Sequence, residues 1–190
     1  MEIRFNSKTP EWEWLSSFYP HPLKAGLSVW PSLEHLYQYA KCVRQEDKDA
    51  IANATTPASA KRLGRELKVI RSDWDEIKEE RMQRCLRWKF TSTESMYLLL
   101  TGTDPHRLIH HAPWDAYWGS GSAGQGLNRQ GELTMSLRSA LLTEKVRPRT
   151  VAVVGSRGFT DARFLGQTLE DLRLESPFNT LISGGARGAD

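Results

Sequence analysis

The sequence predicts an α+β protein that is mostly helical and that ends in a partial βαβ unit. Between residues 32 and 142, most segments place apolar side chains at the three- and four-residue spacing of helices. Beyond residue 149, a buried-strand run, a helical stretch and a second strand run follow one another. That succession is the order of a βαβ unit.

The N-terminal thirty residues are expected to be extended or irregular. Residues 1–5, MEIRF, predict a short opening strand, and residues 11–31 predict a loop or hairpin because they are rich in Trp, Pro and Gly. A helix is then expected from Ser32 to about Arg44, started by Pro31 or capped by Ser32.

Further helices are expected in the middle of the chain, each with a start or stop signal. Their bounds are Glu46–Ala54, Pro57–Leu67, Asp73–Phe90 and Thr93–Leu100. Thr56 and Pro57 form a cap and first-turn pair, and Ser72 or Asp73 is expected to cap the longest helix. Gly102 is expected to follow the last of them as a C′ glycine.

The stretch from Trp114 to Gly131 is expected to be an irregular but ordered loop. It holds five glycines among Trp, Tyr, Asn and Arg residues. Glycines let a backbone approach a ligand closely, and aromatic rings offer stacking faces. A functional loop and a plug of the core are equally open. A last helix, Glu132–Leu142, is expected to turn inward Leu133, Ser136, Leu137 and Ala140.

Composition changes near residue 143, so we expect one domain over residues 1–143, a linker over residues 144–149 and a separate segment over residues 150–190. The linker is polar and contains a proline. A parallel sheet needs helices on both faces, which two strands and one helix do not supply. We therefore expect the last segment to be cut short or to pair with another chain.

Composition excludes several classes of protein. The chain has 190 residues, a formal charge of +3 and two cysteines. The charge permits an anionic ligand or nucleic acid, although dense Lys/Arg runs are missing. We predict no disulfide framework, metal or cofactor, because C-x-x-C and H-E-x-x-H spacings do not occur. Without an apolar leader or a run of about 20 apolar residues, we expect a cytoplasmic protein and no membrane partner.

One helical segment, WPSLEHLYQYAKC at residues 30–42, carries a polar stripe. Glu34, Gln38 and Lys41 are spaced i, i+4 and i+7, so an acid, an amide and an amine share one helical face. Such a stripe is either a solvated surface or the wall of a site.

Three segments resemble, in order, the signatures of the NADAR family, also called YbiA-like. They are WPSLEHLYQYAK at residues 30–41, SDWDEIKEERMQRCLRWKF at residues 72–90 and WDAYWGSGSAGQGLNRQGELTMSLR at residues 114–138. The resemblance extends from about Trp14 to Leu142 and implies the family's fold. One departure is visible, since Ser17 stands where the family often has Asn.

The resemblance implies an N-glycosidase and gives the stripe a chemical role. Cleaving a C–N bond to an exocyclic amine requires protonation of the leaving nitrogen and stabilisation of positive charge at the anomeric carbon. We expect Glu34 to be the acid/base or oxocarbenium stabiliser and Asp115 the second carboxylate. Lys41 would either bind phosphate or capture C1 as a Schiff base.

The resemblance also suggests residues that bind the substrate. They are Gln38, Arg65, Trp74, Tyr117, Trp118, Gly119, Asn128 and Arg129. Trp74 and Trp118 would stack, although Trp74 fits a core aromatic equally well, and Arg129 and Arg65 would bind phosphate. The remaining candidates are predicted to be structural or exposed, namely His35, His110 and His111.

The family's known activities leave three functions open. Some members cleave phosphorylated ribosylamine intermediates of riboflavin synthesis, and others remove ADP-ribose from guanine in DNA. We favour the second, with ADP-ribosylated DNA or nucleotide as the partner. The third is a sensor that binds ADP-ribose or another NAD-derived ligand without catalysis.

The C-terminal segment resembles the nucleotide-binding SLOG group, which has a Rossmann-like fold. VVGSRGF and ISGGARGAD would be its first two strand-end turns. A nucleotide phosphate could meet Gly155, Ser156 and Arg157 in the first turn or Arg187 in the second.

Overall fold

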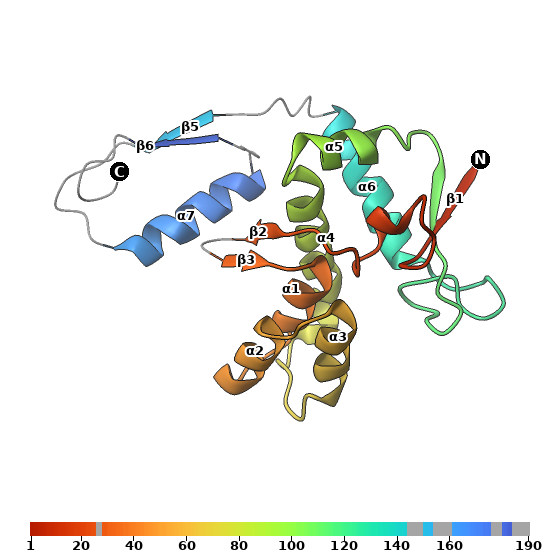
Figure 1. Ribbon diagram of the computed structural model, residues 1–190, viewed down its shortest axis with the longest axis horizontal. Coiled ribbons are helices and arrows are strands. Elements are labelled where there is room, and N and C mark those ends of the chain that lie inside the picture. The colour runs from red at the N-terminus through yellow and green to blue at the C-terminus, as the bar shows by residue number, and fades with distance from the viewer. Residues whose placement is uncertain (26–27, 144–149, 154–160, 176–179, 184–190) are drawn as a thin grey trace.

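The computed structural model describes residues 1–25, 28–143, 150–153, 161–175 and 180–183. It confirms the predicted α+β class, because helices predominate and the strands form small two-stranded sheets. Figure 1 shows the long helix α4 (Trp74–Thr91) in the middle of the N-terminal part. The helices before α4 lie toward one of its ends and the helices after it toward the other.

The first sheet joins segments that are far apart in the sequence. Strand β1 (Glu2–Phe5) pairs in parallel with β4 (Arg107–His110), with Ile3 opposite Leu108. The sequence predicted β1 but not β4, because four residues among polar neighbours carry too little local pattern. Strands β2 (Leu23–Ala25) and β3 (Ser28–Trp30) pair antiparallel. Of the two predicted alternatives, a loop or a hairpin, this pairing supports the hairpin.

Helix α1 (Leu33–Tyr39) ends earlier than expected. Ser32 caps it, as predicted, by accepting a hydrogen bond from the backbone N–H of His35. Beyond Tyr39 the N–H of Lys41 turns back to the carbonyl of Gln38 at 3.2 Å, and the N–H of Arg71 bonds the Lys41 carbonyl at 3.1 Å. The chain thus leaves the helix to pair with a distant segment, and Lys41 lies in the turn after α1.

The next helices follow the expected pattern. They are α2 (Gln45–Ala52), α3 (Pro57–Glu66) and α5 (Glu94–Thr101), whereas the 3-10 turn η1 (Glu13–Leu15) lies in a stretch that was predicted to be a loop or hairpin. Thr56 and Ser59 form a capping box at α3. Asp73 occupies the N-cap of α4, but its carboxylate bonds Arg71 and not the helix. The prediction of a C′ glycine at Gly102 was wrong, because Gly102 is the C-cap of α5 and keeps a right-handed φ of −67°.

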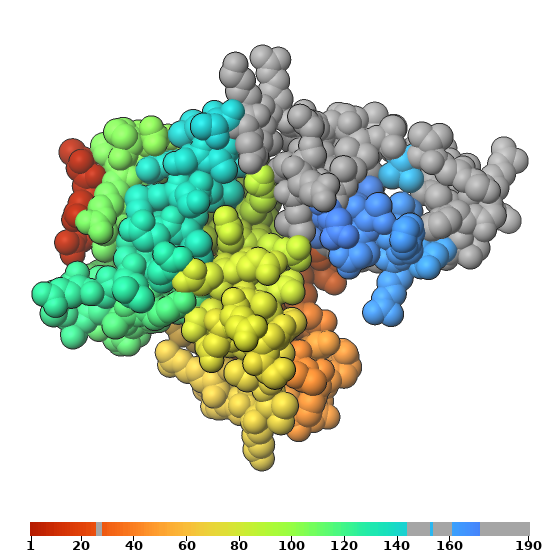
Figure 2. Space-filling view, turned by 180° about the vertical axis from the view of Figure 1, so that it is seen from behind, coloured from red at the N-terminus to blue at the C-terminus, as the bar shows by residue number. Residues whose placement is uncertain are grey.

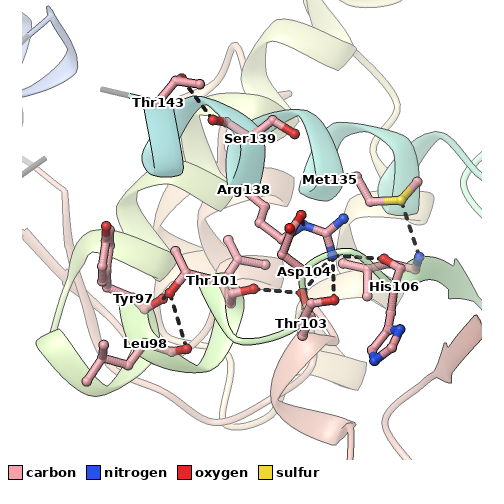
Figure 3. A network of polar contacts seen from close by, with 12 residues as sticks. Tyr97, Leu98, Thr101, Thr103, Asp104, His106, Met135, Arg138, Ser139 and Thr143 are labelled. Atoms are coloured by element: carbon pink, nitrogen blue, oxygen red, sulfur yellow. Dashed lines mark hydrogen bonds and ion pairs between the residues drawn. The ribbon is translucent and has the colours of Figure 1, made fainter. Parts of the chain in front are cut away.

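Helix α6 (Arg129–Thr143) begins three residues earlier than predicted. It turns Leu133 and Leu137 inward, as predicted, together with residues that were not predicted. Its buried face includes Leu137, Arg138 and Leu141, whereas Ser136 is exposed, so that part of the prediction was wrong. Figure 3 shows Arg138, one of the buried residues that the sequence did not predict. Arg138 lies inside the fold and donates from Nη1 to the carbonyls of Thr103 (3.0 Å) and His106 (2.8 Å). A prediction based on apolar residues at helical spacing cannot identify a buried arginine.

The hydrophobic core surrounds α4, which packs against α1, α5 and α6. Figure 2 shows from the opposite side that the segments coloured yellow-green to cyan, α4 to α6, form a continuous face. The fully buried apolar side chains come from both ends of the N-terminal part and include Phe5, Leu15, Leu23, Leu33, Leu86, Phe90, Leu100, Leu108 and Leu141. This core fixes α1 and α4 relative to each other.

The C-terminal segment has the predicted strand–helix–strand order. Strands β5 (Thr150–Val153) and β6 (Thr180–Ser183) pair in parallel, with α7 (Ala162–Glu175) between them in the chain. The predicted linker and the glycine-rich turns with Gly155, Ser156, Arg157 and Arg187 lie outside the described residues. Within the described ranges, no helix combines the length and the apolar character that a membrane span requires.

Candidate active site

A cavity of about 570 Å³ opens between α1, α3, α4 and the irregular loop that precedes α6. Glu34, Gln38 and Lys41 all line it. The polar stripe is therefore the wall of a cavity and not a solvated surface. The other lining residues are Asn6, Ser7, Lys8, Ser16, Ser17, Phe18, Tyr37, Lys61, Arg65, Trp74, Asp75, Lys78, Met82, His110, Trp114, Asp115, Tyr117, Trp118 and Gln130.

Glu34 is a buried carboxylate held by neutral donors. Its side chain is 4% exposed. The Ser17 hydroxyl donates to Oε2 at 2.8 Å, and Gln38 Nε2 donates to Oε1 at 2.6 Å. The Glu34 N–H in turn bonds the Ser17 carbonyl at 3.0 Å. Both carboxylate oxygens are thus fixed in place, and Ser17, the position that departs from the family pattern, supplies one of the two bonds.

Lys41 lines the same cavity as Glu34, and among the described residues its amine forms no ion pair. Its Nζ lies 5.7 Å from the centre of the Tyr37 ring and 5.6 Å from that of Trp74. Burial lowers the pKa of Lys41, the charge of Glu34 opposes that shift, and Lys61 and Arg65 add to it. A lowered pKa makes the ammonium easier to deprotonate, which a lysine nucleophile requires.

Asp115 organises the irregular loop and also lines the cavity. Its Oδ1 accepts hydrogen bonds from the backbone N–H groups of Tyr117 (3.1 Å) and Trp118 (2.8 Å). Among the described residues, Oδ2 has no hydrogen-bond partner. Asp115 is therefore both the anchor of a turn and a carboxylate with one oxygen left for a ligand.

Aromatic rings form a connected series along the cavity. Tyr37 lies 5.2 Å from Trp74 and 5.8 Å from Trp118, centre to centre, and Tyr117 lies 5.1 Å from Trp118. Trp74 is 7% exposed and belongs to the core, yet it also lines the cavity. Trp74 is thus a core aromatic and also a ring at the cavity, which are the two roles that the sequence left open for it. Trp114 is 71% exposed and lies at the cavity too.

Three predicted ligand residues are not among those that line the cavity. Arg129 donates from Nε to Glu79 at 2.6 Å, and this bond, together with one from Tyr117, lowers the pKa of Glu79 to about 2. The Asn128 amide bonds the backbone of β4, accepting from the His110 N–H at 2.8 Å. Gly119 packs so closely on Ala112 that a side chain would not fit. Each of the three makes structural contacts in this fold.

Sequence reasoning missed several residues that line the cavity. Lys61 is one helical turn before Arg65 on α3, so the spacing i, i+4 places the two side chains on one helical face and could have indicated Lys61. Lys8 and Ser17 come from loops whose place is set by long-range contacts, and they carry no local signal. Lys78 pairs with Asp75 at 2.9 Å and lies over the ring of Tyr117 at 4.6 Å.

One buried lysine supports the site from behind. Lys89 on α4 is fully buried, and its Nζ donates to the carbonyl of Ser16 at 2.5 Å. Burial lowers the pKa of Lys89 to about 7. In the described part of the chain no carboxylate pairs with it, and no group of His, Cys, Asp or Glu side chains is arranged to hold a metal ion.

Comparisons with known proteins identify the family. The NADAR domain model matches residues 4–142. N-glycosidase YbiA of Escherichia coli (strain K12) is 37% identical over 144 residues, which cover 75% of this chain and 90% of that protein. N-glycosidase Npun_R5314 of Nostoc punctiforme is 32% identical over 145 residues, covering 74% and 93%. Riboflavin biosynthesis protein VVA0006 of Vibrio vulnificus is 34% identical over 128 residues, covering 67% and 35%.

A solved structure agrees with this relationship. The NMR structure of the E. coli protein YbiA aligns with a TM-score of 0.71 at 35% identity, over 78% of this chain and 91% of that one. The chain therefore belongs to the NADAR family, as its three signature segments predicted.

Proposed function

We propose that this protein is an N-glycosidase that hydrolyses the C–N bond between ADP-ribose and guanine in nucleic acid. The observation that carries the proposal is that Glu34, Lys41 and Asp115 all line one cavity of about 570 Å³. Two carboxylates and a lysine of lowered pKa are the groups that the reaction requires.

Glu34 serves the leaving group in this mechanism. A guanine amine leaves only when a proton reaches its nitrogen, and the anomeric carbon gains positive charge as the bond breaks. A carboxyl at Glu34 supplies the proton, and the resulting carboxylate stabilises that charge. Because Ser17 and Gln38 hold both oxygens, the group does not have to reorient during the reaction.

Lys41 is the nucleophile in the route that we favour. When a glycosylamine opens, C1 becomes an imine, and the Lys41 amine adds to C1. Glu34 takes the proton from the added lysine nitrogen and passes it to the guanine nitrogen, whose bond to C1 then breaks. The product is a Schiff base between Lys41 and C1 of ribose, which water then hydrolyses to free ADP-ribose and free lysine. In the alternative route, Lys41 binds phosphate and Asp115 or Glu34 directs water to C1.

The charge around the cavity supports a substrate with a diphosphate. Lys8, Lys61 and Arg65 line it, and none of them forms an ion pair within the described ranges. Their charges suit phosphate oxygens. We therefore assign the phosphate contacts to these three residues. The resemblance had suggested Arg65 and Arg129 for this role, and the Arg129 guanidinium is bonded to Glu79.

A second substrate class is a ribosylamino-pyrimidine phosphate. What favours it is the similarity to a relative named riboflavin biosynthesis protein, from Vibrio vulnificus. That substrate presents the same C–N bond and one phosphate, so the same catalytic groups would act on it.

The test compares the two substrate classes directly. The protein is incubated with an oligonucleotide ADP-ribosylated on guanine and, separately, with a 5-amino-6-ribosylamino-pyrimidine phosphate, and the released sugar is quantified by chromatography. We expect free ADP-ribose from the first at a rate at least tenfold above release from the second. The reverse ratio would assign the protein to the second class. Tight binding of ADP-ribose with no release from either substrate would make it a sensor.

A further inference from the structure

Gln130 contributes a polar side chain to the cavity that the mechanism does not use. It lies in the first turn of α6, is 2% exposed and lines the cavity. Its backbone holds it firmly, because its N–H bonds the Trp118 carbonyl at 3.2 Å and its carbonyl accepts from the Thr134 hydroxyl at 2.7 Å. The side chain therefore has a fixed origin at the cavity wall.

The amide nitrogen of Gln130 has no partner in the fold. Among the described residues, Nε2 is shielded from solvent and makes no hydrogen bond, so the side chain has to turn toward the cavity for a ligand to accept from it. An unpaired buried donor is costly, and native structures rarely retain one without a ligand or water to complete it. Gln38 presents the complementary case in the same cavity, since its Oε1 is buried and unpaired while its Nε2 is bonded to Glu34.

The surroundings of Gln130 narrow the choice of partner. The Gln130 amide is a neutral donor. The positively charged side chains to which we assign the phosphate, Lys61 and Arg65, lie on a different helix, α3. The bond to Trp118 places Gln130 next to the aromatic wall, where a nucleoside would stack. A neutral donor beside a stacking surface suits an uncharged oxygen of a nucleoside.

We propose that Gln130 is a specificity-determining residue, and that its Nε2 donates a hydrogen bond to an oxygen of the bound nucleoside. The inference rests on the proposed function for the nature of the ligand. The oxygen is either the carbonyl of the base or a ribose hydroxyl. A site built around such a donor rejects ligands that lack the oxygen, because the donor would then stay buried and unpaired.

The experiment measures binding by isothermal titration, with two probes that differ in the carbonyl. Guanosine 5′-monophosphate carries the base carbonyl, and 2-aminopurine riboside 5′-monophosphate lacks it while keeping the ribose. We expect Gln130→Met to weaken binding of guanosine 5′-monophosphate about tenfold. If the base carbonyl is the partner, the second probe binds both proteins equally. If a ribose hydroxyl is the partner, both probes weaken alike.

Two further variants keep the result interpretable. Gln130→Glu preserves the shape but replaces the neutral donor by a negatively charged acceptor, so it should weaken binding of both anionic probes more than Gln130→Met does. Gln83→Met changes an exposed glutamine on α4 and should change nothing. Thermal melts check that each variant is folded.

Two outcomes would overturn the inference. One is unchanged affinity of both probes in Gln130→Met and Gln130→Glu, and the other is a wild-type protein that binds neither probe. Neither outcome concerns catalysis, which is measured by sugar release. A protein that releases ADP-ribose but shows no effect at Gln130 contradicts this inference alone, and one that binds through Gln130 but releases nothing contradicts the proposed function alone.

Discussion

The Nζ of Lys89 lies 2.5 Å from the carbonyl oxygen of Ser16, the residue directly before the serine that holds Glu34. A fully buried lysine therefore supports the loop from behind, while the front of the same loop bonds the proposed catalytic carboxylate. Lys89 lies over the ring of Tyr19, and His21 is also near it, since burial lowers the pKa of His21 and the charge of Lys89 adds to that shift.

Lys89 should make the stability of the protein depend on pH. Burial lowers its pKa to about 7, whereas the unfolded chain has the ordinary value of 10.5. Between these values the unfolded state binds a proton that the folded state does not, so stability rises as pH increases from about 7 to 10. Below pH 7 both states are protonated, and the cost of burying the charge is present in full.

Lys89→Met removes this cost, and we expect it to be more stable than wild type at pH 6 by a few kcal/mol. Urea unfolding at pH 6, 8 and 9.5 measures the effect, with the exposed Lys68→Met as the control. A wild-type protein whose stability does not increase over this range, or a variant with the same slope, would contradict the account of Lys89.

Gly64 leaves the space that Gln38 occupies. A Cβ at Gly64 would overlap Gln38 Oε1 and crowd its Cδ. Gly64→Ala should therefore displace Gln38 from Glu34 and lower turnover about tenfold or more, although Ala is the better helix former. In a Gln38→Ala background the overlap is gone, and adding Gly64→Ala should have no further effect on turnover. Additive losses in the double variant would show that Gly64 acts elsewhere.

Part of this site followed from local pattern, and part from contacts that no local pattern records. The spacing of Glu34 and Gln38 put them on one face, and the structure places both in the cavity. Lys41 reaches the cavity from a turn, because a distant segment pairs with the chain after α1. Nothing in the sequence indicated that Arg129 is unavailable for phosphate, because its partner Glu79 lies fifty residues away in the chain.

The fold shows the same division. Caps at Ser32, Thr56 and Thr93 mark helix starts locally, and all three are present. Strand β4 exists because β1 pairs with it, and the buried Arg138 is tolerated because backbone carbonyls of residues 103 and 106 receive its donors. Such partners are supplied by tertiary structure, which is why short strands and buried charges escape a sequence pattern.

The first 142 residues should fold and act without the C-terminal segment. The family match ends at residue 142, and the cavity is lined by residues between 6 and 130. A protein truncated after Leu142 should keep its melting temperature within a few degrees and its turnover within twofold of the full chain. Precipitation or loss of turnover would mean that the last segment packs against the site.

Lys41 distinguishes the covalent route from the route in which water attacks. Lys41→Arg keeps a positive charge but cannot form an imine, so turnover should fall by orders of magnitude while ADP-ribose still binds. Borohydride added during turnover of the wild type should leave a ribose-linked adduct on the peptide that contains Lys41, detected by mass spectrometry. An active Lys41→Arg protein without any adduct would rule out the covalent route.

The central claim is that Glu34 in this cavity cleaves an ADP-ribosyl C–N bond. The most direct measurement is the mass of an ADP-ribosylated guanine oligonucleotide after incubation with wild type and with Glu34→Gln, a variant that can keep hydrogen bonds to Ser17 and Gln38. We predict that wild type restores the mass of the unmodified oligonucleotide and releases ADP-ribose, whereas the variant is slower by about 10²–10⁴-fold with an unchanged melt. An oligonucleotide that keeps its full modified mass with wild type, or equal rates for the two proteins, would contradict the claim.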